Sequence, residues 1–456
     1  MRWLPYLLLL TSVLVLMVVV PAAQAGTPVP RNEGDLERTT TLGDLLKPGE
    51  PGKVDRTNFH IIYVHGMRAH GGGQSAELRT ALRKYQRWEP SSEVPSGERI
   101  PLAKPRSAFV GEIELWRKAE DWQASLPFIQ RYAFRRGEQS LTVHEVNWWP
   151  LLFPLKCRML LMREHDLAGS DPELLELCSG KRQGYHPWIS PKEMEALSTK
   201  PPRSGGGARI NAHLKRQFVD WGFADAVIAL GPMQTLLRQA VDASFARVEA
   251  SADPSDTVVV VTESLGSFVL LDAYDKGLPG VTATLKKSDY LFFFANQFAL
   301  LELGRITLEP QKADRQTKVS DSKEGDGAIE LHPANRSETL VSGSPLRALE
   351  RWAGESKDSD EPPATPGPAQ LTRPGPPKQV VAFNDPSDAL TFDLPCIKGV
   401  NIINLYVRNT PSWLGLFALP GPAHRGGLEN KHLLRWLLSP NKSDSSPPKC
   451  VDPAKQ

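Results

Sequence analysis

The sequence has almost no net charge, because its 456 residues include 54 lysines and arginines against 52 aspartates and glutamates. A balance near zero creates no strong electrostatic field around a protein, so the composition gives no reason to expect nucleic acid as a partner. Apolar residues make up 40% of the chain, which is enough to build the core of one large domain.

Cysteine is scarce, with four residues at positions 157, 178, 396 and 450. Their spacing and the neighbouring histidines do not indicate a zinc site, and we expect neither a metal nor a cofactor. The four thiols allow three disulfide connectivities, one of which pairs Cys157 with Cys178 and Cys396 with Cys450. One such bridge would contribute about 3 kcal/mol to stability, whereas four unpaired thiols remain the alternative.

Long apolar runs are absent except at the N-terminus, where residues 7–20 are apolar apart from Thr11 and Ser12. A short positively charged start precedes this run, and Ala23 and Ala25 follow it in the positions of a cleavage signal. The pattern predicts a secretory signal peptide over residues 1–25 and an exported, periplasmic or secreted chain. An uncleaved anchor is the alternative, although the run is short for a full span. Nothing else indicates contact with a membrane.

Proline and glycine are unevenly distributed. Arg315–Asp326 is polar and charged, and Glu361–Lys378 contains seven prolines and almost no apolar residues. Such segments cannot bury enough surface to offset the entropy lost on ordering, so we predict a disordered insertion over residues 306–378. One short helix is expected inside it, over residues 345–353. The tail, residues 441–456, is also polar.

The remaining chain alternates predicted strands with predicted helices. This alternation predicts an α/β fold with a mostly parallel sheet covered by helices on both faces. We expect one domain over residues 58–440, preceded by an extension over 26–57 and containing a helical, cap-like insertion over 150–255. The expected strands are Phe59–Val64, Leu141–Trp149, Val258–Thr262, Tyr290–Ala295, Gln379–Phe383 and Val400–Val407, and the first is followed by a helix over Gln74–Trp88.

The most informative segment places one serine between a buried strand and a buried helix. Four valines, Val258–Val261, lead through Thr262 and Glu263 to Ser264, and an apolar helical run follows over Phe268–Tyr274. A sharp turn from strand to helix lifts a serine hydroxyl above the edge of the sheet, with the helix N-terminus facing it. Ser264 is therefore the candidate nucleophile.

A serine nucleophile needs a histidine and an acid from later strand ends. Asp385 and Asp388 both follow the predicted strand Gln379–Phe383, and we favour Asp388; both residues could instead simply cap a turn. His424 lies in a stretch rich in glycine and proline that we interpret as a loop before a helix over Leu428–Leu438. His432, inside that helix, is the alternative base.

These segments together resemble the α/β-hydrolase superfamily, and among its members uncharacterised bacterial exported hydrolases more than any named lipase. The matching residues are Tyr63-Val64-His65-Gly66, Thr262-Glu263-Ser264-Leu265-Gly266, the Asp388 turn and Ala423-His424. The resemblance covers about 58–150, 255–300 and 378–440 and omits both insertions. The chain departs from the family pattern at Thr262, which replaces the first glycine of G-x-S-x-G, and at Glu263, where many relatives carry histidine or tyrosine.

The resemblance implies a serine hydrolase that cleaves a small-molecule or lipid carboxylic ester. Ser264 would attack, His424 would take its proton and Asp388 would orient the histidine, with an oxyanion hole formed by amides of Leu265 and of the Gly66–Met67 loop. A binding or scaffold protein that keeps the fold without turnover is the alternative, which Thr262 and the insertions would suit. His65 is expected to hydrogen-bond its turn rather than to catalyse. The run Gly71–Gly73 lacks the lysine of a phosphate loop.

Overall fold

A computed structural model gives the structure of the chain. It describes residues 29–30, 39–47, 57–67, 73–92, 97–102, 126–160, 172–181, 187–199, 223–231, 233–303, 345–354, 378–388, 390–409 and 420–439. The predicted signal peptide, most of the predicted insertion over 306–378, and the tail with Cys450 lie outside these residues. Within them, no helix is long and apolar enough to span a membrane.

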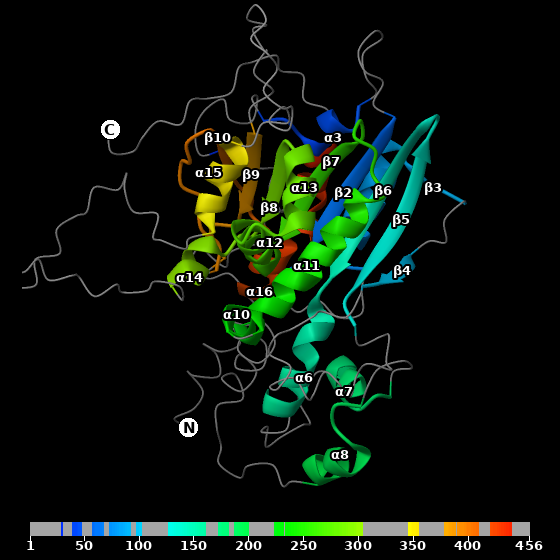
Figure 1. The fold of residues 1–456 in the computed structure, drawn as a ribbon, viewed down its shortest axis with the longest axis vertical. Coiled ribbons are helices and arrows are strands. Elements are labelled where there is room, and N and C mark those ends of the chain that lie inside the picture. The colour runs from blue at the N-terminus through cyan, green and yellow to red at the C-terminus, as the bar shows by residue number, and fades with distance from the viewer. Residues whose placement is uncertain are drawn as a thin grey trace, which may run out of the picture.

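The centre of the molecule is a ten-stranded sheet in the order β1-β10-β9-β8-β7-β2-β6-β5-β3, with β4 paired to β5 (Figure 1). The strands from β10 to β6 in this order are parallel to their neighbours, whereas β1, β3, β4 and β5 pair antiparallel at the two edges. The parallel strands are β2 (Asn58–Val64), β6 (Gln139–Asn147), β7 (Thr257–Glu263), β8 (Tyr290–Phe294), β9 (Lys378–Asn384) and β10 (Val400–Tyr406). The antiparallel strands are β1 (Val29–Pro30), β3 (Glu89–Pro90), β4 (Glu98–Pro101) and β5 (Phe128–Arg136). This arrangement confirms the predicted α/β class with a mostly parallel sheet.

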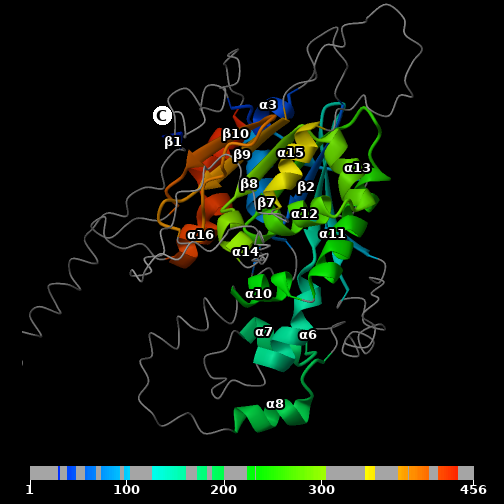
Figure 2. The same cartoon turned by 60° about the vertical axis from the view of Figure 1, so that its left-hand side comes forward.

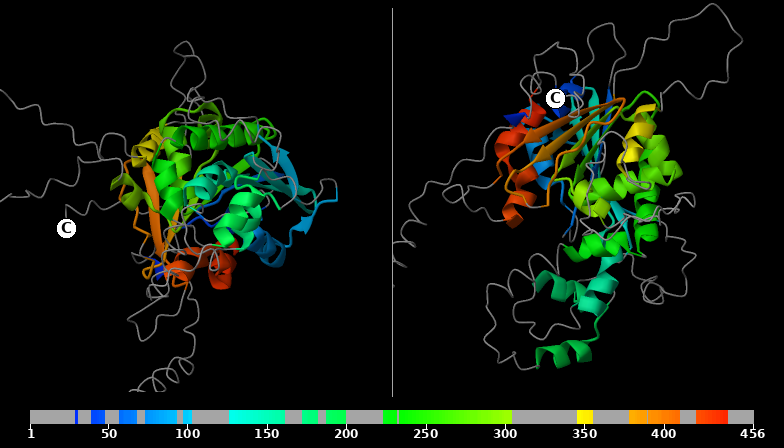
Figure 3. Two further views of the ribbon diagram at one scale, coloured as in Figure 1. Left: turned by 90° about the horizontal axis from the view of Figure 1, so that it is seen from below. Right: turned by 90° about the vertical axis from the view of Figure 1, so that its left-hand side faces the viewer.

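Helices cover both faces of the sheet, which the view from below shows as three layers (Figure 3). One face carries α11 (Gln234–Glu249), α12 (Leu265–Asp275), α13 (Pro279–Lys287) and α15 (Leu346–Gly354). The other carries α3 (Leu42–Leu45), α4 (Ala76–Gln86), α16 (Pro420–Glu429) and α17 (Lys431–Leu438). Because both faces are covered, the inner strands are apolar throughout rather than alternating.

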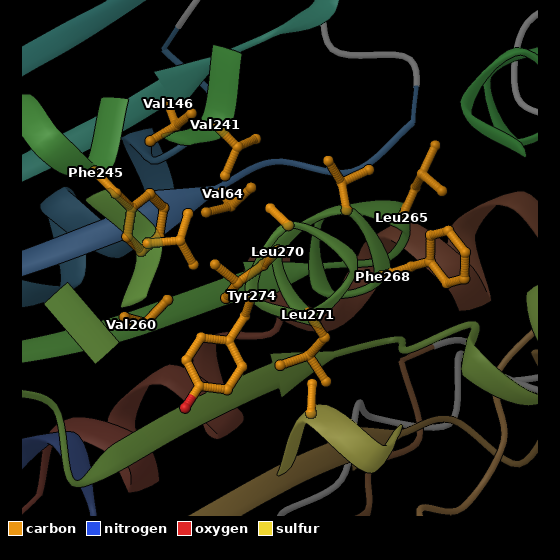
Figure 4. Close-up of a cluster of buried hydrophobic side chains, with 14 of the residues drawn as sticks. Val64, Val146, Val241, Phe245, Val260, Leu265, Phe268, Leu270, Leu271 and Tyr274 are labelled. Atoms are coloured by element: carbon orange, nitrogen blue, oxygen red, sulfur yellow. The ribbon is translucent and has the colours of Figure 1, made fainter. Parts of the chain in front are cut away.

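The larger core lies between the sheet and α11, α12, α13 and α15 (Figure 4). Val64 and Val260 of the sheet meet Val241 and Phe245 of α11, and Leu270 of α12 lies among them. All five side chains are at least 99% buried, and α12 is therefore held rigidly at the end of β7 that carries Ser264.

Two helices of this face fall in segments that the sequence assigns to insertions. α11 lies within residues 150–255, yet its apolar face packs into the main core. α15 matches the helix predicted over 345–353, and Leu349 and Trp352 are completely buried, with Trp352 Nε1 donating to the Leu285 carbonyl. α15 is thus an integral part of the core, whereas most of the rest of the span 306–378 lies outside the described residues.

A group of short helices extends below the sheet (Figure 2). The disulfide Cys157–Cys178 joins them and lies in a small separate core with Trp149 and Trp188. This bridge confirms one of the pairs considered from the sequence; Cys396 is exposed and Cys450 lies outside the described residues, so their pairing stays a prediction. The short elements here and near β8 are η2 (Trp149–Leu152), α6 (Phe153–Leu155), η3 (Lys156–Leu160), α7 (Pro172–Cys178), α8 (Pro191–Ser198), α10 (Ala224–Leu230) and α14 (Phe298–Leu303).

Candidate active site

Ser264 occupies a sharp turn between β7 and α12. Its backbone has φ 51° and ψ −123°, and its amide donates to the Phe294 carbonyl over 2.7 Å. A positive φ is rare for a residue with a side chain and costs about 1–3 kcal/mol, so the packing of β7 and α12 must impose it. The turn places the Ser264 hydroxyl at the carboxyl end of the sheet, where the sequence predicts it.

Two glycines make room for this turn. A Cβ atom on Gly266 would lie 2.4 Å from the carbonyl oxygen of Val64, so α12 can approach the end of β2 only without a side chain there. A Cβ atom on Gly66 would lie 2.6 Å from Ser264 Cβ. Thr262, the departure from the family pattern, is fully buried in β7, and its hydroxyl has no hydrogen-bond partner among the described residues. The sharp turn thus forms without a glycine at position 262.

His424 is the histidine that lies against Ser264. Its Nε2 is 2.7 Å from Ser264 Oγ, and both residues are at least 91% buried. His432, the alternative, is exposed on α17, and its amide and that of Leu433 donate to the N-cap Asn430. The structure therefore brings only the first of the two candidate histidines to the serine.

The prediction that His424 lies in a loop is wrong, because it is the fifth residue of helix α16. Prolines stand first and third in this helix, where the missing amide hydrogens are not needed. The glycines serve close packing: a Cβ on Gly426 would lie 2.6 Å from Asn409 Cβ, and one on Gly427 would lie 3.2 Å from Phe294 Cδ1. His424 is therefore fixed on a helix packed against β8.

Asp388 is the acid that contacts His424. Its Oδ2 lies 2.6 Å from His424 Nδ1 and also accepts from the Thr391 hydroxyl, while its Oδ1 accepts from the Leu390 amide over 2.9 Å. Asp385 instead accepts from the amides of Ser387 and Asn409, over 2.8 and 2.7 Å. Burial raises the pKa of Asp385. Asp385 thus holds the turn together, and Asp388 faces the histidine.

Gln297 is a neighbour of this group that the sequence analysis misses. It lies three residues after the end of β8 and is 99% buried. Its Nε2 lies 3.3 Å from His424 Nε2, while its Oε1 has no partner among the described residues. Its position depends on the left-handed turn at Ala295, with φ 50°, which nothing in the run of phenylalanines predicts.

The residues expected to form an oxyanion hole lie on two sides of Ser264. Leu265 is the first residue of α12, where an amide hydrogen has no acceptor within the helix. Gly66 approaches Ser264 from the end of β2, and Met67 follows it, half-buried against the main core. These positions allow backbone amides to face an oxygen atom bound beside Ser264 Oγ.

His65 hydrogen-bonds its own turn, as the sequence predicts. Its Nδ1 lies 2.7 Å from the Gly66 carbonyl and its ring stacks on Trp148 with 4.6 Å between centroids. Burial lowers the pKa of His65 to about 3, so the ring is neutral at neutral pH and donates its Nδ1–H to this carbonyl.

Glu263 beside the nucleophile is bound to a tyrosine. Tyr63 donates its hydroxyl to Glu263 Oε2 over 2.5 Å, and burial together with this carboxylate raises the pKa of Tyr63 well above its usual value. The bond ties the end of β2 to the residue before Ser264.

Comparisons of the chain with protein-family models, with curated proteins and with solved structures found no match.

Proposed function

We propose that the protein is a serine hydrolase of the α/β-hydrolase superfamily that cleaves a carboxylic ester. The observation that carries the proposal is the continuous series of contacts from Ser264 Oγ to His424 Nε2 and from His424 Nδ1 to Asp388. A serine hydroxyl is a poor nucleophile on its own, and it becomes a good one when a neighbouring imidazole can take its proton. The three groups also follow each other along the chain in the order of that superfamily.

In the proposed reaction, Ser264 Oγ attacks the carbonyl carbon of the ester while its proton passes to His424 Nε2. The carboxylate of Asp388 accepts from Nδ1–H, which fixes the tautomer and stabilises the imidazolium. The imidazolium then gives its proton to the alcohol oxygen as the C–O bond breaks. Water repeats the sequence on the acyl-serine and releases the acid.

The negative charge on the former carbonyl oxygen would be met by the amides of Leu265 and of the Gly66–Met67 segment. Gly66 supports this role, because its lack of a side chain leaves the Ser264 hydroxyl uncovered on that side. No cofactor enters these steps. An exported location is part of the proposal, and the Cys157–Cys178 bridge supports it because disulfides persist in oxidising compartments.

Hydrolysis of a short-chain p-nitrophenyl ester by the mature chain tests the proposal. His424→Ala should reduce kcat by several orders of magnitude, because the serine loses its base. His432→Ala is the matched control, since its imidazole is exposed on the neighbouring helix, and it should keep wild-type activity. Equal activity of the two variants, or no hydrolysis by the folded wild type, would contradict the proposed function.

A further inference from the structure

A pocket of about 440 Å³ lies between β4, β5, β6 and the end of α11, whose places in the fold are labelled in Figure 1. Its charged lining consists of Arg99, Arg131, Arg247 and Glu98, and His144 lines it from β6. The pocket is remote from Ser264. His144 on β6 is level with Val260 on β7, four residues before Ser264, and β2 lies between these two strands.

The three guanidinium groups outnumber the single carboxylate, so the pocket is positively charged. Arg131 pairs with Glu98, with 2.5 Å between Nη2 and Oε2, and the guanidinium carbon of Arg99 lies 3.7 Å from the centroid of the Phe128 ring. Arg247 is exposed on the last turn of α11, and no described residue forms an ion pair or a hydrogen bond with its side chain. Guanidinium groups bind phosphate and carboxylate oxygens strongly.

A buried chain of two histidines ends at this pocket. His60 Nε2 lies 3.1 Å from Asp256 Oδ2, and His60 Nδ1 lies 3.0 Å from His144 Nε2. Burial lowers the pKa of both rings, against the pull of Asp256 and Asp253 on His60. Lys287 near His60, and Arg131 near His144, act in the same direction as burial. Both rings are therefore neutral near pH 7.

The positions of the hydrogens on the two histidines follow from Asp256, which is the acceptor at the end of this hydrogen-bonded series. Because Asp256 can only accept, His60 Nε2 carries a hydrogen and its Nδ1 is an acceptor. His144 must then donate from Nε2, which leaves its Nδ1 without a hydrogen. No described residue hydrogen-bonds that atom. The pocket thus offers positive charge together with a neutral hydrogen-bond acceptor, His144 Nδ1.

We propose that this pocket binds a phosphate group that still carries a proton, either inorganic phosphate or a phosphate monoester. Its charged oxygens would meet Arg247 and the neighbouring arginines, and its P–O–H group would donate to His144 Nδ1. A phosphate monoester loses its second proton at a pKa of about 6, so the protonated form is present near that pH. Sulfate has a similar size and a larger negative charge but no proton, and it would place lone pairs against Nδ1.

Isothermal titration calorimetry of the full chain at pH 6 and constant ionic strength tests the proposal, with inorganic phosphate, glycerol 2-phosphate and sulfate as probes. At least one of the two phosphates should bind at least tenfold more tightly than sulfate. Tighter binding of glycerol 2-phosphate would identify an organic phosphate as the ligand, and equal or tighter binding of inorganic phosphate would identify the free ion.

Arg247→Gln should weaken phosphate binding at least tenfold without affecting the fold, because its side chain contacts no described partner. Arg83→Gln is the matched control: Arg83 is exposed on α4, on the opposite face of the sheet, and its loss should change nothing. Failure of both phosphates to bind at millimolar concentration, sulfate binding as tight as phosphate binding, or equal affinities of Arg247→Gln and wild type would each overturn the proposal. None of these outcomes depends on Ser264.

Discussion

The carboxylate of Asp388 lies 2.6 Å from Nδ1 of His424, although the two residues come from different segments of the chain, 36 positions apart. Asp388 follows β9, and His424 lies on the helix after β10. Since β9 and β10 are adjacent and parallel, their carboxyl ends bring the two side chains to the same edge of the sheet. Asp385, only three residues away, binds backbone amides instead.

Substitution of the two aspartates distinguishes their roles. Asp388→Asn should lower kcat by about 10⁴, because the amide favours the wrong tautomer of His424. Asp385→Asn is the matched control, and it should act mainly on stability, since two backbone amides lose a carboxylate acceptor. Steady-state kinetics and urea unfolding of both variants measure these effects. A larger loss of kcat in Asp385→Asn would exchange the two assignments.

Because Gly66 lies close to Ser264, we predict that adding one methyl group at position 66 lowers the catalytic rate. In Gly66→Ala, the new Cβ would lie 2.6 Å from Ser264 Cβ and 2.8 Å from the Glu263 carbonyl oxygen, so the turn must shift. A displacement of about 1 Å at a reacting group can cost about 100-fold in rate, and we expect a fall in kcat of that order. Gly354→Ala is the control, because its Cβ would meet open space at the end of α15. Wild-type kcat in Gly66→Ala would refute this role of the glycine.

Buried neutral histidines predict that the protein loses stability in acid. The pKa of His65 falls to about 3 in the fold, against about 6.5 in an unfolded chain. Below pH 6.5 the unfolded chain binds a proton that the folded protein does not, so stability falls with pH down to about 3. From pH 7.5 to pH 5, His65 alone accounts for about 2 kcal/mol of this loss. His60 and His144 act in the same direction.

Urea unfolding of wild type and His65→Gln at these two pH values measures the effect. The variant should lose about 2 kcal/mol less than wild type over this interval, whatever its stability at pH 7.5. His432→Gln, with its imidazole exposed, should follow wild type. Identical pH dependence of wild type and His65→Gln would show that His65 is not a buried neutral group.

The sequence predicts the central strands well because each is a continuous apolar run, and the boundaries of β7, β8 and β9 differ from the expected ones by one residue or two at most. It misses β5, in which apolar residues alternate with glutamine and arginine in an antiparallel position near the edge. Nor does it give the order of the strands, which depends on pairing between distant segments.

Residues of the candidate site could be predicted where a short stretch of sequence determines the local backbone conformation. The valine run before Ser264 and the glycine at 266 specify the turn from strand to helix. The sequence around His424 predicts a loop incorrectly, because two tightly packed glycines and two prolines in a first helical turn have the composition that is typical of a loop. The turn after β9 directs Asp388 rather than Asp385 toward His424. The sequence around the two aspartates does not predict which of them faces the histidine.

Labelling of the folded full chain with a fluorophosphonate, followed by mass spectrometry of the modified peptide, tests the central claim most directly. Such a probe forms a stable bond only with a serine whose neighbouring base can take its proton. We predict one adduct, located on Ser264, absent from Ser264→Ala and strongly slowed in His424→Ala. Absence of any adduct on folded wild-type protein, or undiminished labelling of Ser264→Ala, would contradict the account.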